Sequence, residues 1–240
     1  MHITVRGTWP GPITLRQGWA KAVARQWNEF VPDAQMRLVR GSAGFIAAAT
    51  NHLLDTVALG VTSPPLPEMG ANAWRKAGYH NYLHLDLFSM DLHALPKAPD
   101  HTVRSDQPGL WDDAVAIDSA AFQVRWRLGS VGLAEARDAT TRSAFLTLED
   151  EDRLAGFAIV GVAGPVSYLQ RVAVLPEARG FGYGRSLVRA SAQWGRARGG
   201  RSMLLNTQPD NEAAAALYQS EGFHKLPAGL NVLRYPGPLS

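Results

Sequence analysis

The stretch from residue 168 to residue 187 constrains this chain more than any other. It reads YLQRVAVLPEARGFGYGRSL, an apolar run that ends at Pro176 and is followed by a glycine-rich turn. β-Branched residues such as Val172 and Val174 favour a buried strand. The glycines leave backbone N–H groups uncovered, and a helix beginning near Gly184 would add the positive end of its dipole. The sequence therefore predicts a strand, a turn suited to a phosphate or pyrophosphate, and a helix.

Two familiar glycine-rich phosphate motifs do not fit this turn. A dinucleotide-binding G-x-G-x-x-G would need a glycine at position 185, where the chain has Arg185. A P-loop would need Lys and then Ser or Thr after its last glycine, and Gly184 is followed by arginine. The turn therefore belongs to neither class.

The pattern Arg179-x-x-Gly182-x-Gly184 after a strand resembles the acyl-CoA signature of the GNAT superfamily of N-acetyltransferases. A second segment, N-x-x-A-x-x-L-Y-x-x-x-G-F from Asn211 to Phe223, resembles the C-terminal motif of the same superfamily. The resemblance to this superfamily covers roughly Asp100 to Tyr235, about the length of one domain. The resemblance implies an α/β fold of the α+β type, with a mixed central β-sheet flanked by helices.

The resemblance also implies acetyl-CoA as cosubstrate and a role for particular residues. Tyr218 would protonate the sulfur of the departing coenzyme A, although a buried aromatic on an Ala-rich helix is the simpler alternative. Asn211 would contact the pantetheine arm, cap its helix, or do both. Backbone groups of the strand would pair with the pantetheine arm, and the turn would hold the pyrophosphate. The coenzyme-binding residues expected are Val172, Ala173, Val174, Arg179, Gly180, Phe181, Gly182, Tyr183, Gly184, Arg185, Ser186 and Asn211.

A general base is not evident in the sequence. Many GNAT members place a carboxylate on the strand that precedes the turn, and this chain has Gln170 and Arg171 there. Asp118, Glu149 and His224 are available, but nothing in their spacing favours any one of them. We therefore assign no base.

The composition of the chain excludes several kinds of chemistry and several classes of partner. The chain of 240 residues is 46% hydrophobic and has no cysteine, which excludes disulfides, a thiol nucleophile and a Cys-based zinc site and suits a reducing cytoplasm. No apolar run approaches the roughly 18 to 20 residues of a membrane span, and the N-terminus lacks a signal pattern, so we expect a cytoplasmic protein without a membrane partner. A net charge of +3 modestly favours an anionic ligand. We expect no nucleic-acid partner, because Arg185, Arg189, Arg196 and Arg198 fit a solvated helix face.

We expect an N-terminal α/β domain over residues 1–95 and a GNAT domain over 96–240, with the proline-punctuated segment 94–100 as linker. A capping box and apolar residues at helical spacing predict an amphipathic helix over residues 14–30. His80, His84 and Asp86 would lie on one face of a strand, but the two histidines would be roughly 13 Å apart, so we expect no metal site.

A segment of the N-terminal part resembles the C-terminal motif. Around Gly78-Tyr79 a helix end, a glycine and a strand follow one another in the same order as around Gly222-Phe223. Aligning these two segments places Trp74 opposite Tyr218. No phosphate loop precedes this first copy. We therefore expect a truncated GNAT-like repeat with a structural or substrate-shaping role.

The sequence thus predicts an acetyltransferase that moves the acetyl group of acetyl-CoA directly to a primary amine of a small molecule or peptide. The alternative is a non-catalytic acyl-CoA-binding or regulatory protein, and a homodimer remains open for either. Glu149 to Asp152 predict a solvated hairpin tip between two strands, at 144–148 and 154–160.

Overall fold

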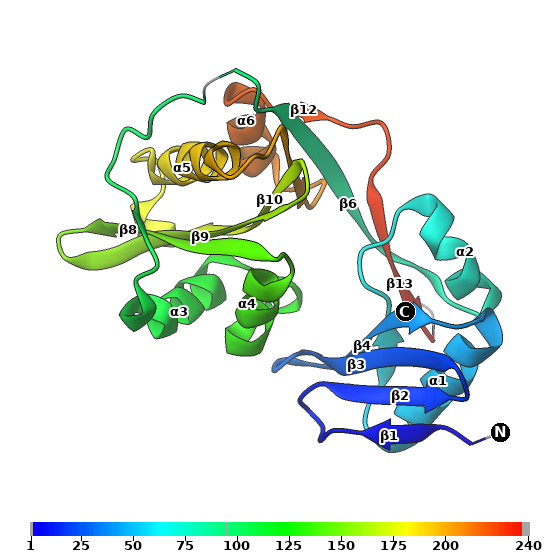
Figure 1. Cartoon of the computed structure of the whole chain (residues 1–240). Coiled ribbons are helices and arrows are strands. Elements are labelled where there is room, and N and C mark those ends of the chain that lie inside the picture. Colours follow the sequence, from blue (N-terminus) through cyan, green and yellow to red (C-terminus); the bar gives the residue numbers. More distant parts are fainter. Residues whose placement is uncertain (1, 95, 237–240) are drawn as a thin grey trace. The chain divides into compact units, whose positions relative to one another are not determined.

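The last strand of the chain, β13 (Leu230–Tyr235), lies in the same sheet as the first strands. The computed structural model describes residues 2–94 and 96–236, and it divides into two units (Figure 1). The first unit contains the chain up to Asp86 and again from Pro227 onward, and the second runs from Leu87 to Leu226. This division differs from the predicted boundary between residues 95 and 96, because β13 joins the N-terminal unit.

The sheet of the first unit has the strand order β1-β2-β3-β4-β5-β13-β6. Its other strands are β1 (Thr4–Arg6), β2 (Ile13–Gln17), β3 (Ala20–Asn28), β4 (Val31–Arg40), β5 (Gly60–Thr62) and β6 (His80–Asp91), of which β6 ends in the second unit. Neighbouring strands are antiparallel except β4 and β5, which are parallel and are joined by α1 (Ala43–Thr56). Apolar residues of α1 and of α2 (Glu68–Lys76) pack against this sheet, among them Phe45, Leu53 and Trp74.

The helix predicted over residues 14–30 is wrong, because β2 and β3 form an antiparallel hairpin there. Gly18, at φ 58°, lies in its turn, and Trp19 beside it is 67% exposed. Ala20, Ala22 and Ala24 alternate with more exposed residues and are buried. Alanine is only weakly hydrophobic, so the alternation of these buried residues was not evident in the sequence. The larger apolar residues, which lie on both faces of the hairpin, have a spacing that resembles that of a helix.

The sheet of the second unit runs β7-β8-β9-β10-β11 and continues to the end of β6, which β12 also pairs. The strands are β7 (Arg104–Ser105), β8 (Arg142–Asp150), β9 (Arg153–Ala163), β10 (Val166–Val174), β11 (Ser202–Thr207) and β12 (His224–Lys225). The helices are α3 (Trp111–Ala121), α4 (Gly129–Asp138), α5 (Tyr183–Ala197) and α6 (Glu212–Ser220), with short 3₁₀ turns at Pro108–Leu110, Val124–Trp126 and Pro176–Ala178. The predicted mixed sheet flanked by helices is confirmed.

Strand β9 shows why this unit has helices on both faces of its sheet (Figure 1). Phe157 and Ile159 lie in a cluster with residues of α3 and α4. Ala158 and Val160 lie in a second cluster with residues of α5. A strand buried on both faces reads as a continuous apolar run, which is what the sequence of β9 shows. The predicted β8–β9 hairpin is confirmed.

The junctions from α2 to β6 and from α6 to β12 have the same backbone geometry. Gly78 and Gly222 both adopt positive φ, 90° and 95°. The next residue donates its N–H back to the helix in each case, from Tyr79 to the Trp74 carbonyl at 3.1 Å and from Phe223 to the Tyr218 carbonyl at 3.0 Å. This is the hydrogen bonding of a Schellman helix end. The two helix ends that the alignment pairs therefore share this local geometry, and the repeat itself stays a prediction.

Among the helices of the described residues, none has both the length and the apolar character that crossing a membrane requires.

Candidate functional site

Strand β10 leaves part of one edge unpaired. It pairs with β9 along its whole length, but with β11 only at Val166, Ser167 and Tyr168. Beyond Tyr168 the two parallel strands separate, and within the described chain no strand pairs with the β11-facing edge of β10 from there on. Val172–Val174, the residues expected to pair with a pantetheine arm, lie on this free edge. Unpaired backbone groups of this kind require a partner, either water or a ligand.

The turn after β10 has the conformation that its glycines permit. Gly180 and Gly182 adopt φ 89° and 85°, a region in which other residues are strained, and Gly182 is the N-cap of α5. Among the described residues, no backbone carbonyl accepts a hydrogen bond from the N–H of Gly180, Phe181 or Gly182. These amides and the first turn of α5 present unpaired donors of the kind that anions accept from at helix N-termini.

Contacts at Gly184 bring three elements of the site together. A Cβ added to Gly184 in α5 would lie 3.4 Å from Leu217 of α6 and 3.8 Å from Val174 of β10. The turn, the free edge of β10 and the helix that carries Tyr218 therefore meet around this glycine.

Tyr218 is buried, with 6% of its surface exposed. Its ring lies between Phe88 and Phe223, at centroid distances of 6.0 and 5.8 Å. No hydrogen-bond partner for the hydroxyl exists among the described residues. Burial raises the pKa of Tyr218 to about 12, and the positive charge of Arg171 on β10 opposes that rise. The phenol is therefore a protonated donor at neutral pH whose hydroxyl the protein leaves unpaired.

Asn211 is the N-cap of α6. Its side-chain oxygen accepts a hydrogen bond from the Ala214 N–H at 3.3 Å. The capping role expected for this residue is therefore present, and a role toward pantetheine remains a prediction.

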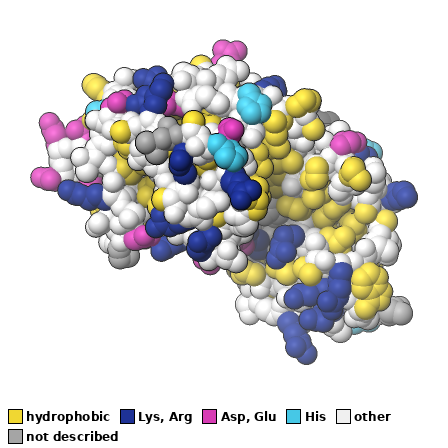
Figure 2. All heavy atoms as spheres, turned by 45° about the horizontal axis from the view of Figure 1, so that its top comes forward, with side chains coloured by type: hydrophobic (Ala, Val, Ile, Leu, Met, Phe, Trp, Pro, Cys, Tyr) yellow, Lys and Arg dark blue, Asp and Glu magenta, His cyan; other side chains and the backbone are white. Residues whose placement is uncertain are grey.

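Two arginines expected to contact the coenzyme are engaged within the protein. Arg179 donates to the Ala121 carbonyl at 3.2 Å. The Nε of Arg185 lies 2.9 Å from a carboxylate oxygen of Glu221, a residue that also binds Arg189. The expectation that the arginines of α5 form a solvated face is wrong for Arg189, whose side chain is 13% exposed, while the side chain of Arg185 is 43% exposed. In the view of Figure 2, Lys and Arg side chains of the second unit lie among acidic and uncharged ones.

The side chain of Ser186 has a structural role. Its side chain is fully buried, and its oxygen accepts hydrogen bonds from the backbone N–H groups of Asp100 and His101, both at 3.2 Å. Ser186 therefore holds the segment before β7, and a contact of its hydroxyl with a phosphate stays a prediction.

The two carboxylates among the three candidate bases have partners within the protein. Asp118 is fully buried. Its Oδ2 accepts a hydrogen bond from Nε of Arg171 at 2.6 Å, and its Oδ1 accepts one from the Leu128 N–H at 2.8 Å. Burial lowers the pKa of Arg171, and the Asp118 charge partly offsets this effect. Glu149 pairs with Arg104 at 2.8 Å. Both carboxylates are therefore committed to ion pairs.

One residue next to the turn was missed by sequence reasoning. The Nε2 of His101 lies 2.9 Å from the carbonyl oxygen of Phe181. His101 precedes the first strand of the second unit and belongs to neither motif, so only the tertiary fold could reveal it.

A mixed sheet whose parallel strands separate opposite a glycine-rich helix N-terminus defines a GNAT-type fold. Residues 111–223 match the model of the acetyltransferase (GNAT) family, and this part of the chain belongs to that family. The family uses acetyl-CoA as cosubstrate. The fold of the whole chain resembles the solved structure of a tandem GNAT protein from the clavulanic acid biosynthesis pathway, with a TM-score of 0.66 and 15% identity over 95% of this chain and 83% of that one.

Curated relatives match part of the chain. A mycothiol acetyltransferase of Frankia alni is 31% identical over 140 residues, which are 51% of this chain and 42% of that protein. An aminoglycoside N(6')-acetyltransferase of Salmonella typhimurium is 33% identical over 63 residues, 26% of this chain and 43% of that protein. The chain thus spans less than half the length of these relatives.

Proposed function

We propose that the second unit transfers the acetyl group of acetyl-CoA to a primary amine of a small molecule or peptide. The observation that carries this proposal is the meeting of β10, the Gly180–Gly184 turn and α6, the helix that carries the buried Tyr218, at Gly184. Each offers unpaired donors of a kind that an acyl-CoA thioester can use. The names of the matching relatives favour a small-molecule acceptor.

Each element has a separate task in this reaction. The turn amides bind the pyrophosphate, and the backbone of Val172–Val174 pairs with the pantetheine arm and polarises the acetyl carbonyl. Tyr218 donates a proton to the sulfur as the C–S bond breaks. Acetyl-CoA supplies an activated acetyl thioester. Since the chain has no cysteine, the amine attacks this thioester directly and no thioester forms on the protein.

The amine must be neutral when it attacks. With Asp118 and Glu149 held in ion pairs, the proton leaves through water, or the acceptor is an amine of low pKa. A profile of rate against the pKa of a series of amines distinguishes the two routes.

We further propose that the first unit is a truncated GNAT-like copy without a coenzyme site. Its β4 and α1 are joined by Gly41 and Ser42 alone. The Ser42 hydroxyl accepts the N–H of Phe45 at 3.3 Å, which occupies the helix end that a phosphate would need. A Cβ on Gly41 would also lie 2.6 Å from the Phe45 ring, so this turn is closed by packing. A structural role, or one in shaping the acceptor site, remains for this unit.

Release of coenzyme A thiol from acetyl-CoA, measured over a panel of amines, tests the activity. A thiol reagent is suitable because the protein contributes no cysteine. Amine-dependent release above the rate without protein supports the acetyltransferase. Tight binding of acetyl-CoA with no release for any amine would instead support the non-catalytic acyl-CoA-binding alternative.

A further inference from the structure

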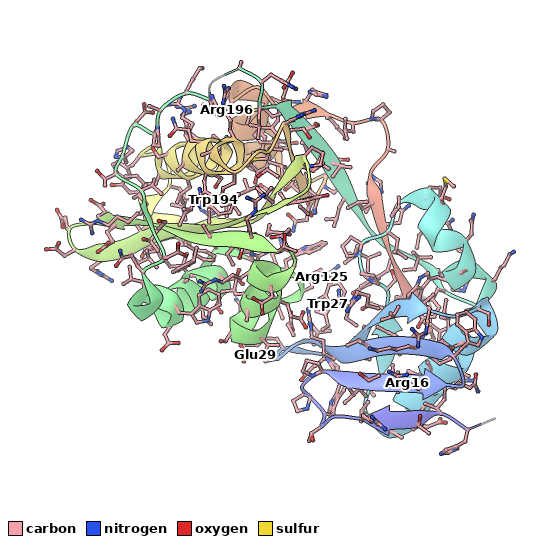
Figure 3. All side chains as sticks on the ribbon, in the orientation of Figure 1. Arg16, Trp27, Glu29, Arg125, Trp194 and Arg196 are labelled. Atoms are coloured by element: carbon pink, nitrogen blue, oxygen red, sulfur yellow. The ribbon has the colours of Figure 1, made fainter. Side chains whose placement is uncertain are left out.

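The segment that follows β6 lies along α5 and is not a free linker (Figure 1). Polar side chains at one side of α5 form hydrogen bonds with its backbone. Arg196 donates to the carbonyls of Leu92 and His93 at 3.0 and 2.6 Å. Gln193 donates to the Lys97 carbonyl and Arg189 to the Ala98 carbonyl, both at 3.2 Å, and Ser186 accepts from the N–H groups of Asp100 and His101. In Figure 3 the labelled Arg196 lies on the side of α5 toward this segment, and Trp194 lies on the side toward the sheet. The described part of segment 92–101 is thus fixed from one end of α5 to the other.

This fixation places His101 beside the glycine-rich turn. Because a carbonyl oxygen can only accept, the Nε2 of His101 must carry the proton in its 2.9 Å hydrogen bond to Phe181. The imidazole ring meets the Tyr183 ring edge-on, with centroids 4.8 Å apart. The backbone N–H of His101 is held by Ser186. Both ends of the residue are therefore fixed against the start of α5.

The hydrogen bond acts on a peptide group that is otherwise easily rotated. Phe181 lies between Gly180 and Gly182, and glycine has more accessible backbone conformations than any other residue. In a planar trans peptide the C=O of one residue and the N–H of the next point in opposite directions. Holding the Phe181 carbonyl therefore also fixes the direction of the Gly182 N–H, which is one of the unpaired amides of the turn.

We propose that His101 is a positioning residue for acyl-CoA, which keeps the Gly182 N–H directed into the pyrophosphate site. This inference rests on the proposed function. His101 lies outside residues 111–223, the part that matches the GNAT family model, so the role belongs to the way this chain ties segment 92–101 to α5.

The test compares His101→Leu with His101→Gln, whose side-chain amide can reach the same carbonyl as a donor. Affinity for coenzyme A is measured by calorimetry, and kcat and KM for acetyl-CoA by thiol release. We expect His101→Leu to weaken coenzyme A binding and raise KM about three- to tenfold, the equivalent of one hydrogen bond, with kcat changed less than about twofold. His101→Gln should restore both to near the wild-type values. His93→Leu, at an exposed histidine of the same segment, should change neither.

Unchanged coenzyme A affinity in His101→Leu, or failure of glutamine to restore a lost affinity, overturns the inference and leaves the proposed function intact. A loss confined to kcat does the same. If the wild type binds coenzyme A but releases none with any amine, the acetyltransferase proposal fails while the binding data still decide the role of His101. A wild type that binds no coenzyme A overturns both. Since His101 is exposed, these variants should fold, and His101→Ala provides a second loss of the contact.

Discussion

At the scale of single residues, the surroundings of two tyrosines distinguish a candidate catalytic residue from a structural one. Tyr79 and Tyr218 are both buried. The Tyr79 hydroxyl is paired with the Thr50 hydroxyl at 2.6 Å, inside the core of the first unit. The Tyr218 hydroxyl has no such partner among the described residues. A hydroxyl without a protein partner is available to donate to a ligand.

We expect Tyr218→Phe to lower kcat about 100-fold or more, with KM for acetyl-CoA changed little, because the change removes the proton donor and no internal hydrogen bond. Steady-state kinetics and a thermal unfolding curve measure both effects. Tyr79→Phe is the matched control: it should cost about 1 kcal/mol of stability through the lost Thr50 contact and leave kcat unaltered. Equal turnover of Tyr218→Phe and wild type would remove Tyr218 from the mechanism.

The pKa of Tyr218 also predicts the pH profile. Burial raises this pKa to about 12, so the protonated donor is favoured and is lost only as the pH rises toward that value. We therefore expect kcat/KM to rise with pH as the acceptor amine loses its proton, with no decline due to Tyr218 below about pH 11. Rates between pH 6 and 10 in a constant-ionic-strength buffer check this. A decline near pH 9 that disappears in Tyr218→Phe would contradict it.

At the scale of elements, the turn between β10 and α5 depends on backbone conformation more than on side chains. Gly180 has no atom within 4 Å of a Cβ position, so space does not require glycine there. Its positive φ does. The side chains of Arg179, Arg185 and Ser186 have partners within the protein, whereas no backbone carbonyl among the described residues accepts from the amides of the turn.

Gly182→Ala is expected to weaken coenzyme A binding about tenfold or more, because alanine resists φ 85° and a shifted backbone redirects the amides. Gly199→Ala is a close control at the other end of the same helix. Gly199 has φ 89° and nothing within 4 Å of its Cβ position, so the variant should lose about 1 kcal/mol of stability and keep its coenzyme A affinity. If both variants bind coenzyme A equally well, the turn is not the pyrophosphate site.

The elements that follow from local sequence were predictable, and those that depend on distant partners were not. The strand, turn and helix around Gly182 follow from residues next to one another, as does the glycine helix end at Gly222. The β2–β3 hairpin was missed because its buried face is largely alanine. The segment 92–101 lacks periodicity, and only the side chains of α5 reveal that it is fixed. Ser186 and Asp118 looked available because their partners are distant in sequence.

At the scale of the whole molecule, the first unit is closed by residues from the far end of the chain. Arg234 of β13 is 1% exposed on its side chain and binds Asp33 of β4 through two hydrogen bonds, of 2.7 and 3.0 Å. Pairing with Asp33 raises the pKa of Arg234, so the guanidinium stays charged. β13 also lies between β5 and β6 and pairs with both.

We expect Asp33→Ala to destabilise the first unit by about 3 kcal/mol or more, because it leaves a buried guanidinium without its carboxylate. Hydrogen exchange should show lost protection in β4 and β13 and retained protection in α5. The control is Arg75→Ala, which breaks an exposed ion pair with Glu68 in the same unit and should cost no more than about 0.5 kcal/mol. Similar costs for the two variants would mean that the buried pair contributes little.

The position of β13 bears on how the protein is made. Domains generally fold as units while the ribosome is still adding residues. Here β5 and β6 keep open edges until Leu230–Tyr235 has been synthesised, since that strand separates them in the sheet. Open edges invite pairing with other chains. The N-terminal residues, although made first, therefore complete their fold only after the whole second unit has emerged.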